Sequence, residues 1–314
     1  MGMLIKAKTL LIVIGGPTGI GKSSIAYNLA LKLNGEIISA DSMQFYREIN
    51  IGTDKVPLWM REKVSHHLID FLSIYDDFDV YQFIKLATEK IDEILKKGRI
   101  PIVVGGSGLY LRSLLKGIFY IPDEMKEKQR DIRNNLEREP TEKLYHMLQK
   151  IDPSLVKVLH PNDRKRIRRA LEVYQLTGRT MSSLQKEKTS PLPENIHTYY
   201  YILTRDRVEM YNIIEKRVER MFENGWVREV EELKIKGYEE YLKKKAPIGY
   251  KEIMEYLDGR YNINELKELI KKKTKNLAKR QLTWFKKEDG IWIKIEGEGE
   301  KIVSEITEKI RRVI

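Results

Sequence analysis

Short apolar runs alternate with amphipathic segments over the first 120 residues of the chain. The apolar runs have the length of buried strands, and residues 80–97 repeat apolar positions at the spacing of one helix face. This alternation predicts an α/β fold in which helices flank a parallel sheet, with ligands bound at the carboxyl ends of its strands. The expected strands are 9–14, 36–40, 66–70 and 100–104, and the expected helices are 24–33, 80–97 and 109–115.

The middle of the chain has a different character. From Pro122 to about Pro193 it is charged and helical in pattern, with no strong strand signal, which predicts an all-helical insertion. The expected later elements are a strand at 197–203, helices at about 207–223, 226–236, 248–257 and 263–286, a strand at 291–295 and a terminal helix. The expected division is 1–121 for the first part of the core, 122–196 for the insertion and 197–314 for the second, mostly helical part of the core.

A glycine-rich loop joins the first predicted strand to the first predicted helix. It fits the pattern G-x-x-x-x-G-K-[ST] in full, and its residues are Gly16, Pro17, Thr18, Gly19, Ile20, Gly21, Lys22 and Ser23. The glycines let backbone N–H groups converge on an anion, and the helix N-terminus adds partial positive charge. Lys22 supplies a point charge, and the Ser23 hydroxyl is able to reach a magnesium ion. The loop therefore predicts a diphosphate or polyphosphate site in a P-loop NTPase-like core, rather than a glycine turn without a ligand.

Composition limits the possible partners and chemistry. The chain has a formal net charge of +12 and no cysteine, which excludes disulfides, thiolate zinc sites and cysteine nucleophiles and fits a cytoplasmic protein. Residues 1–120 hold 15 Lys and Arg against 12 Asp and Glu, so most of the basic excess lies beyond the phosphate-loop half. The excess indicates either a surface for a polyanion or a merely solvated basic surface. The first apolar run is too short to span a bilayer and has no cleavage site, so no signal peptide, anchor or membrane partner is expected.

Polar residues follow two of the predicted strands. Asp41 comes at the end of strand 36–40, on the edge where the phosphate loop is expected, and is either a turn former or a catalytic or magnesium-linked residue. Ser107 lies in the glycine cluster after strand 100–104 and could hydrogen-bond a ligand. A P-loop ATPase usually presents an acid after such a strand to hold magnesium. The glycines found here therefore point away from motor-type ATPases and towards small transferases.

Two basic segments suggest contact with nucleic acid. The helix that Asn162 or Asp163 caps carries five basic residues in its first turns, where acids would be favoured by about 0.3–1 kcal/mol each. A helix start that faces phosphates explains this placement better than a purely structural helix does. The segment 271–287 has eight basic residues and no acid. Residues interpreted as ordinary structure are His66, His67, Trp284, Phe285 and, taken alone, Arg217.

Eight stretches, in order along nearly the whole chain, resemble the bacterial tRNA dimethylallyltransferase (tRNA isopentenyltransferase) family. They are GPTGIGKS (16–23), DSMQFYREINIGTDK (41–55), HHLID (66–70), GRIPIVVGGSGLYLRSLLKG (98–117), HPNDRKRIRRALEVYQLTGR (160–179), RVERMFENGW (217–226), PIGYKEIMEYLDG (247–259) and LAKRQLTWF (277–285). Serine stands at 23 and 107, where many members have threonine, and either hydroxyl serves. Gly19-Ile20 replaces the usual small pair, and the zinc-finger extension of eukaryotic members is absent.

The resemblance implies transfer of a dimethylallyl group from dimethylallyl diphosphate to tRNA. The acceptor would be the exocyclic N6 amine of the adenosine 3′ of the anticodon, and the helical insertion would clasp the anticodon stem-loop. Asp41 would be the base or hydrogen-bond partner of that amine. Lys22, the loop amides, Ser23 with Mg²⁺ and Arg217 would stabilise the leaving diphosphate. The expected tRNA contacts are Asp41, Ser42, Met43, Gln44, Ser107, Lys165, Arg166, Ile167, Arg168, Arg169, Lys279, Arg280 and Gln281, and a monomer is expected.

Two other classes of protein use the same loop. An adenylate-type isopentenyltransferase or small-molecule kinase would act on a free nucleotide, and such an enzyme has no use for a basic helical insertion and a basic C-terminal helix. A nucleic-acid-binding ATPase without transferase chemistry should offer an acid after strand 100–104, where this chain has glycines.

Overall fold

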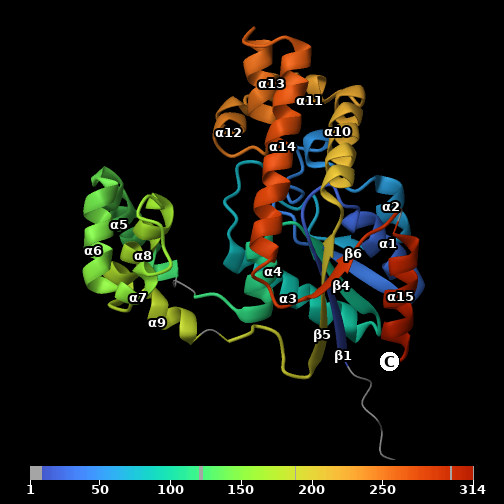
Figure 1. Cartoon of the computed structure of the whole chain (residues 1–314), viewed down its shortest axis with the longest axis horizontal. Coiled ribbons are helices and arrows are strands. Elements are labelled where there is room, and N and C mark those ends of the chain that lie inside the picture. The colour runs from blue at the N-terminus through green and yellow to red at the C-terminus, as the bar shows by residue number, and fades with distance from the viewer. Residues whose placement is uncertain (1–8, 120–122, 188, 298, 314) are drawn as a thin grey trace, which may run out of the picture. The chain divides into compact units, whose positions relative to one another are not determined.

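The computed structural model describes residues 9–119, 123–187, 189–297 and 299–313 (Figure 1). The chain forms two compact units, one made of Met1–Leu114 with Leu192–Ile314 and the other of Leu115–Pro191. The boundary expected between 121 and 122 lies outside the described residues, as do residues 1–8. In the described part of the chain, no helix is both long and apolar enough to cross a membrane.

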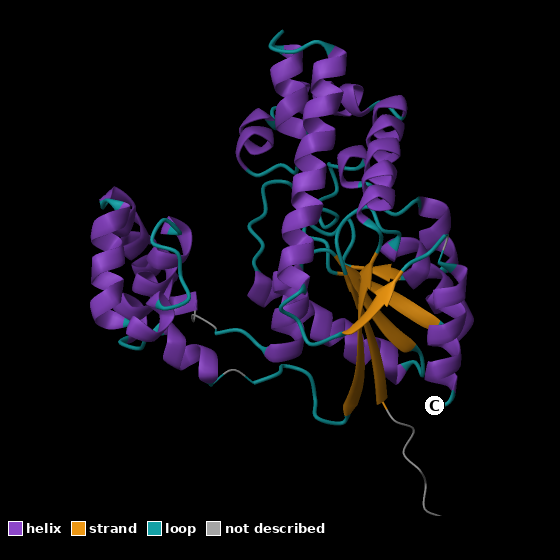
Figure 2. Ribbon diagram, viewed as in Figure 1, coloured by secondary structure: helices purple, strands orange, loops and turns teal. Residues whose placement is uncertain are grey.

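Six parallel strands form one sheet in the larger unit (Figure 2). The sheet order is β3-β2-β4-β1-β5-β6, and the strands are β1 (Thr9–Gly15), β2 (Gly35–Ser39), β3 (His66–His67), β4 (Ile100–Gly105), β5 (Ile196–Thr204) and β6 (Ile291–Lys294). The predicted parallel sheet flanked by helices is confirmed. Strand β3 is shorter than the expected 66–70, because the backbone turns left-handed at Leu68 and Asp70, with φ of 58° and 55°.

Most helices of this unit begin and end close to the predicted residues. The helices are α1 (Lys22–Leu33), α2 (Leu58–Lys63), α3 (Val80–Lys96), α4 (Gly108–Lys116), α10 (Arg207–Glu223), α11 (Trp226–Ile235), α12 (Glu239–Lys244), α13 (Tyr250–Leu257), α14 (Ile263–Phe285) and α15 (Glu300–Arg311). The short helices α2 and α12 were not predicted. Local signals explain several ends: Asp79 and Gln82 form a capping box at the start of α3, and Asn34 ends α1 in the left-handed conformation.

The core of the sheet lies along β1, where Leu11 to Ile14 are fully buried. On one face Leu10, Ile12 and Ile14 pack with apolar residues of α1 and α15, while α3 packs on β2 and β4. A second cluster joins α10, α11, α13 and α14 to residues 43–51. Its largest fully buried side chain is Trp226, whose ring would overlap a Cβ at Gly52 or Gly249. The close approach at these glycines holds the segment after β2 against the helices.

The smaller unit is built from helices and turns over its described residues. Its helices are α5 (Lys126–Arg138), α6 (Thr141–Ile151), α7 (Pro153–Val156), α8 (Arg164–Thr177) and α9 (Met181–Lys186). They enclose their own apolar core, in which Leu144, Leu148, Ile167 and Leu171 are fully buried.

A buried carboxylate links the starts of three neighbouring strands. Glu36 of β2 is 1% exposed, and it accepts hydrogen bonds from His67 of β3 at 2.6 Å and from Arg99, just before β4, at 2.8 Å. Lys97 lies 3.3 Å from the same carboxylate. Burial favours the neutral acid, but the hydrogen bonds and charges of His67 and Lys97 outweigh it and hold the pKa of Glu36 below its usual value.

We expect Glu36→Gln to lower the free energy of unfolding by about 1–3 kcal/mol at neutral pH, since Lys97 and Arg99 lose the negative charge of the buried carboxylate that they bind. Because the folded-state pKa is lowered, this stabilisation is present above the ordinary value of 4.5 and is lost as the pH falls through the lowered pKa. Urea unfolding of the unmodified protein and of Glu36→Gln, at about pH 7 and about pH 3, measures this difference in the free energy of unfolding. An equal difference in stability at the two pH values would contradict the assignment.

Candidate active site

The predicted phosphate loop lies at the carboxyl end of β1 and leads directly into α1. Gly16, Gly19 and Gly21 have φ of 145°, 77° and 91°, in the region that favours glycine. A Cβ at Gly16 would lie 2.5 Å from the Leu203 carbonyl oxygen, so space as well as conformation requires glycine there. The first amides of α1 have no acceptor within the helix and are available to an anion.

Lys22 folds back over this loop. Its Nζ donates a hydrogen bond to the carbonyl oxygen of Pro17 at 2.6 Å. Burial lowers the pKa of Lys22 to about 8; the Asp41 carboxylate partly offsets this, and the Arg217 guanidinium adds to it. The predicted lysine, aspartate and arginine are therefore close enough to influence one another's charge.

A cavity of about 380 Å³ opens beside the loop. Its lining includes the phosphate loop, the end of β2 and one face of α10. The polar lining residues are Thr18, Lys22, Ser23, Ser24, Ser39, Asp41, Gln44, Thr53, Asp54, His66, Lys216, Arg217 and Arg220. Loop amides and cations thus surround a space in which an anion can bind, with Ser23 on its wall.

Arg217 is directed into this cavity, unlike the solvated helix arginine that its local sequence suggests. Its Nη1 donates to the Thr18 hydroxyl at 2.6 Å, and its Nε lies 3.2 Å from the Asp54 carboxylate. Asp54 also pairs with Arg220 at 3.4 Å. Sequence reasoning did not find Asp54, Lys216 or Arg220. The signal was available for the cations, because residues three or four apart share a helix face.

A second cavity, of about 410 Å³, adjoins the first. The two share the lining residues Thr18, Lys22, Asp41, Thr53, Gly106 and Arg217. The second cavity also has an apolar wall, formed by Met43, Val218, Met221, Trp226, Ile248 and Leu277. Its polar lining also includes Ser42, Ser107, Lys245, Thr274, Arg280 and Gln281, so the predicted residues Ser42, Ser107, Arg280 and Gln281 meet at one place. Asp41 lies where the two cavities join.

Hydrogen bonds fix the backbone around Asp41. Its carboxylate accepts from the Met43 N–H at 3.1 Å, and the Ser107 hydroxyl accepts from the Ser42 N–H at 3.4 Å. Gln44, expected to contact tRNA, is 7% exposed, and its amide contacts the Asp54 carbonyl oxygen at 3.4 Å. The Gln44 side chain therefore supports the segment that carries Asp54.

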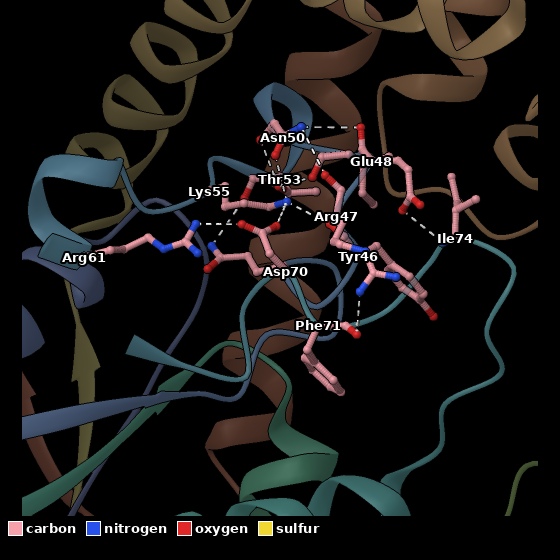
Figure 3. A network of polar contacts seen from close by, with 12 residues as sticks. Tyr46, Arg47, Glu48, Asn50, Thr53, Lys55, Arg61, Asp70, Phe71 and Ile74 are labelled. Carbon is pink, nitrogen blue, oxygen red and sulfur yellow. Dashed lines mark hydrogen bonds and ion pairs between the residues drawn. The ribbon is translucent and has the colours of Figure 1, made fainter. Parts of the chain in front are cut away.

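A polar network, shown in Figure 3, holds residues 46–55 in place. The Lys55 ammonium pairs with Asp70 and donates to the Tyr46 carbonyl oxygen at 2.7 Å. Arg61 binds the other oxygen of Asp70 at 2.6 Å. Burial lowers the pKa of Lys55, while the hydrogen bond and charge of Asp70 counteract that effect. Lys55 therefore has a structural task, although it belongs to the motif that carries Asp41.

The cations at the start of α8 divide into partly buried and exposed ones. Arg164 donates to the carbonyl oxygens of residues 139 and 137 at 2.7 and 2.6 Å, Arg168 pairs with Glu137, and Arg169 pairs with the buried Glu172. Lys165 and Arg166 remain exposed, and Arg166 lies 3.5 Å from the Asp163 carboxylate in an exposed ion pair. Ile167 was expected to contact tRNA, but its side chain is fully buried in the core of the smaller unit, so that expectation is wrong for the side chain.

The basic run on α14 is also partly neutralised. Lys271 lies 2.7 Å from Glu219, Lys273 lies 2.5 Å from Glu252, and Lys275 pairs with Glu215. The exposed cations of the run that form no ion pair within the described residues are Lys272, Lys279, Arg280, Lys286 and Lys287. Phe285 is fully buried, and Arg112 stacks over Trp284 at 4.3 Å.

The two histidines have structural partners, although His66 also lines the first cavity. His67 bonds to Glu36, and His66 Nδ1 lies 2.7 Å from the Val64 carbonyl oxygen. Within the described residues, no group of three or more His, Cys, Asp and Glu side chains is arranged to hold a metal.

Comparison with known proteins finds one family along most of the chain. The IPP transferase family model matches residues 44–288, and the Isopentenyl transferase model matches residues 9–63. A tRNA dimethylallyltransferase of Thermotoga maritima is 38% identical over 303 residues, which is 96% of this chain and 97% of the relative.

Solved structures give the same result. The crystal structure of tRNA delta(2)-isopentenylpyrophosphate transferase from Staphylococcus epidermidis is 36% identical, with a TM-score of 0.68 over 97% of this chain and 99% of that one. A eukaryotic dimethylallyltransferase acting on tRNA is 30% identical, with a TM-score of 0.78 over 97% of this chain and 78% of that one.

The pKa of about 8 for Lys22 predicts pH-dependent anion binding. Affinity for inorganic diphosphate, measured by calorimetry with Mg²⁺ present, should weaken as the pH rises from about 7 to about 9, because Lys22 loses its charge. Lys22→Met should bind more weakly at about pH 7 and lose most of this dependence. Lys32→Met, at an exposed lysine of the same helix, is the control and should behave like the unmodified protein. An unchanged pH dependence in Lys22→Met would contradict the role of Lys22.

Proposed function

The chain belongs to the IPP transferase family, and from this membership and the geometry of its site we propose that it is a tRNA dimethylallyltransferase. It transfers the dimethylallyl group of dimethylallyl diphosphate to the exocyclic N6 amine of the adenosine 3′ of the anticodon. The products are N6-isopentenyladenosine in tRNA and diphosphate.

One observation carries this proposal, namely the junction of the two cavities at Asp41, Lys22 and Arg217. The first cavity has the loop amides and cations that a diphosphate requires. The second has an apolar wall and opens beside Asp41, as an acceptor base and a five-carbon chain would need. Donor and acceptor would then meet at the residues that both cavities share.

The chemistry assigns a task to each side of the junction. The N6 amine is a poor nucleophile because its lone pair is delocalised into the adenine ring. In the reaction the N6–carbon bond forms, the allylic carbon–oxygen bond breaks, and Asp41 takes the proton that N6 loses. Lys22, Arg217 and the loop amides stabilise the charge that develops on the leaving diphosphate.

Magnesium would be held largely by the substrate. Ser23 lies on the wall of the first cavity, and the described residues offer no carboxylate cluster of their own for a metal. One hydroxyl together with diphosphate oxygens and water is a donor set that suits Mg²⁺. When bound there, the ion would neutralise part of the diphosphate charge.

Binding of tRNA would use the exposed cations. Lys165 and Arg166 of the smaller unit, with Lys279 and Arg280 of α14, are the candidates for phosphate contacts. The target base must leave its stack to reach the second cavity, and phosphate contacts would help to offset that cost. A tRNA substrate supports a cytoplasmic location, and the proposed active unit is a monomer because both cavities are formed within one chain.

The function is tested with purified protein, Mg²⁺, dimethylallyl diphosphate and an anticodon stem-loop that carries adenosine 3′ of the anticodon. Mass spectrometry should show the gain of one five-carbon unit on that adenosine. A stem-loop without this adenosine is the control. Gain on free AMP, with none on several stem-loops, would instead support an adenylate-type isopentenyltransferase.

Asp41→Asn tests the proposed base. The amide keeps an oxygen for the Met43 N–H but cannot accept a proton, so kcat should fall by about 10²–10⁴-fold. Stem-loop and diphosphate affinities should stay close to those of the unmodified enzyme. Unchanged turnover in single-turnover kinetics would remove Asp41 from the catalytic role.

The exposed cations of α8 are tested by salt dependence. The double variant Lys165→Ala/Arg166→Ala should weaken tRNA binding and reduce the slope of log affinity against log salt by about 0.7–0.9 for each phosphate that it no longer neutralises. Lys150→Ala, at an exposed lysine of α6, is the matched control. If the salt slope is the same in the double variant and in Lys150→Ala, Lys165 and Arg166 are ordinary solvated surface residues that do not contact tRNA.

A further inference from the structure

Helix α14 rests on three glycines at the carboxyl edge of the sheet. Ala278, Gln281 and Phe285 recur at the spacing of one helix face, and the first and last of them are fully buried. A Cβ at Gly15 would lie 2.7 Å from Phe285, one at Gly106 would lie 2.8 Å from Gln281, and one at Gly108 would overlap Trp284. The glycines around Ser107 therefore make room for this helix.

The Gln281 amide connects the two glycine-rich loops. Its Oε1 accepts a hydrogen bond from the Thr18 N–H at 2.9 Å, and its Nε2 donates to the Gly106 carbonyl oxygen at 3.0 Å. A single orientation of the amide satisfies both groups, one needing an acceptor and the other a donor. This use of the side chain differs from the tRNA contact expected for Gln281.

Thr18 is held from a second side as well. Its hydroxyl accepts from Arg217 of α10, which is itself paired with Asp54. With its amide bound to α14 and its hydroxyl bound to α10, Thr18 has little freedom to move. It immediately precedes the amides of residues 19–23, on which diphosphate binding depends.

We propose that Gln281 is a positioning residue for the phosphate loop. By fixing Thr18 relative to Gly106, it holds the loop amides and Lys22 in the arrangement that binds diphosphate, before any substrate arrives. This inference rests on the proposed function, because it assumes that the loop serves a diphosphate. It assigns to α14 a task in donor binding in addition to contact with tRNA.

The test separates donor binding from tRNA binding. Gln281→Met keeps the length of the side chain and removes both hydrogen bonds, so the Kd for inorganic diphosphate with Mg²⁺ should rise about tenfold. The KM for dimethylallyl diphosphate should rise with it, while the Kd for the stem-loop stays unchanged. Gln281→Glu keeps an acceptor for Thr18 but adds negative charge beside the anion site, and should bind diphosphate still more weakly. Thermal unfolding checks that both variants are folded.

Arg280→Met is the matched control on the same helix. Arg280 is exposed and lines the second cavity, so this variant should weaken stem-loop binding and leave diphosphate affinity unchanged. Gln281 variants with weaker stem-loop affinity and unaltered diphosphate affinity would overturn the proposal in favour of a tRNA contact. Diphosphate binding needs no prenyl transfer, so failure of the proposed function alone leaves this result intact. No diphosphate binding by the unmodified protein would overturn the positioning role.

Discussion

Positive charge gathered beside two carboxylates at one edge of the sheet is the arrangement on which the site depends. An anion site needs cations close together, but in the free protein those cations repel one another, and burial disfavours their charge. Lys22 shows both effects in its lowered pKa. Asp41 partly offsets them for Lys22, and Asp54 pairs with Arg217 and Arg220. The same aspartates help to line the cavity in which the diphosphate would bind.

The segment that follows β2 keeps those carboxylates in place. Lys55 bonds to the Tyr46 carbonyl oxygen within the segment and pairs with Asp70 beyond β3, and Gln44 contacts the Asp54 carbonyl oxygen. Where the segment packs on the helices, the Trp226 ring lies so close to Gly52 that it leaves no space for a Cβ there. The segment is therefore a rigid frame, and its motif combines residues for chemistry with residues for support. Rigidity matters because a misplaced base or cation contributes little to the transition state.

The basic segments of α8 and α14 show that tertiary structure decides which cations of a charge run are paired and which are exposed. On α14 the lysines at 271, 273 and 275 pair with glutamates of neighbouring helices, whereas Arg280 lines the second cavity. On α8, Arg169 pairs with the buried Glu172, and Lys165 stays exposed. Only the exposed cations of such a run are available to a nucleic acid.

The sequence by itself determined the elements and the phosphate loop, because periodicity, caps and glycines act over a few residues. Strands such as 9–14 and helices such as 207–223 were predicted to within one or two residues. The helical character of the middle segment was predicted as well. Tertiary structure alone decided that Ile167 is buried and that Gln281 joins two loops. Arg217 was expected at the diphosphate from its motif, and the tertiary structure supplies its contact with Thr18. Thr18 and Gln281 are 263 positions apart, and no local pattern carries information over that separation. Such contacts depend on how the helices pack on the sheet, and packing is a property of the whole chain.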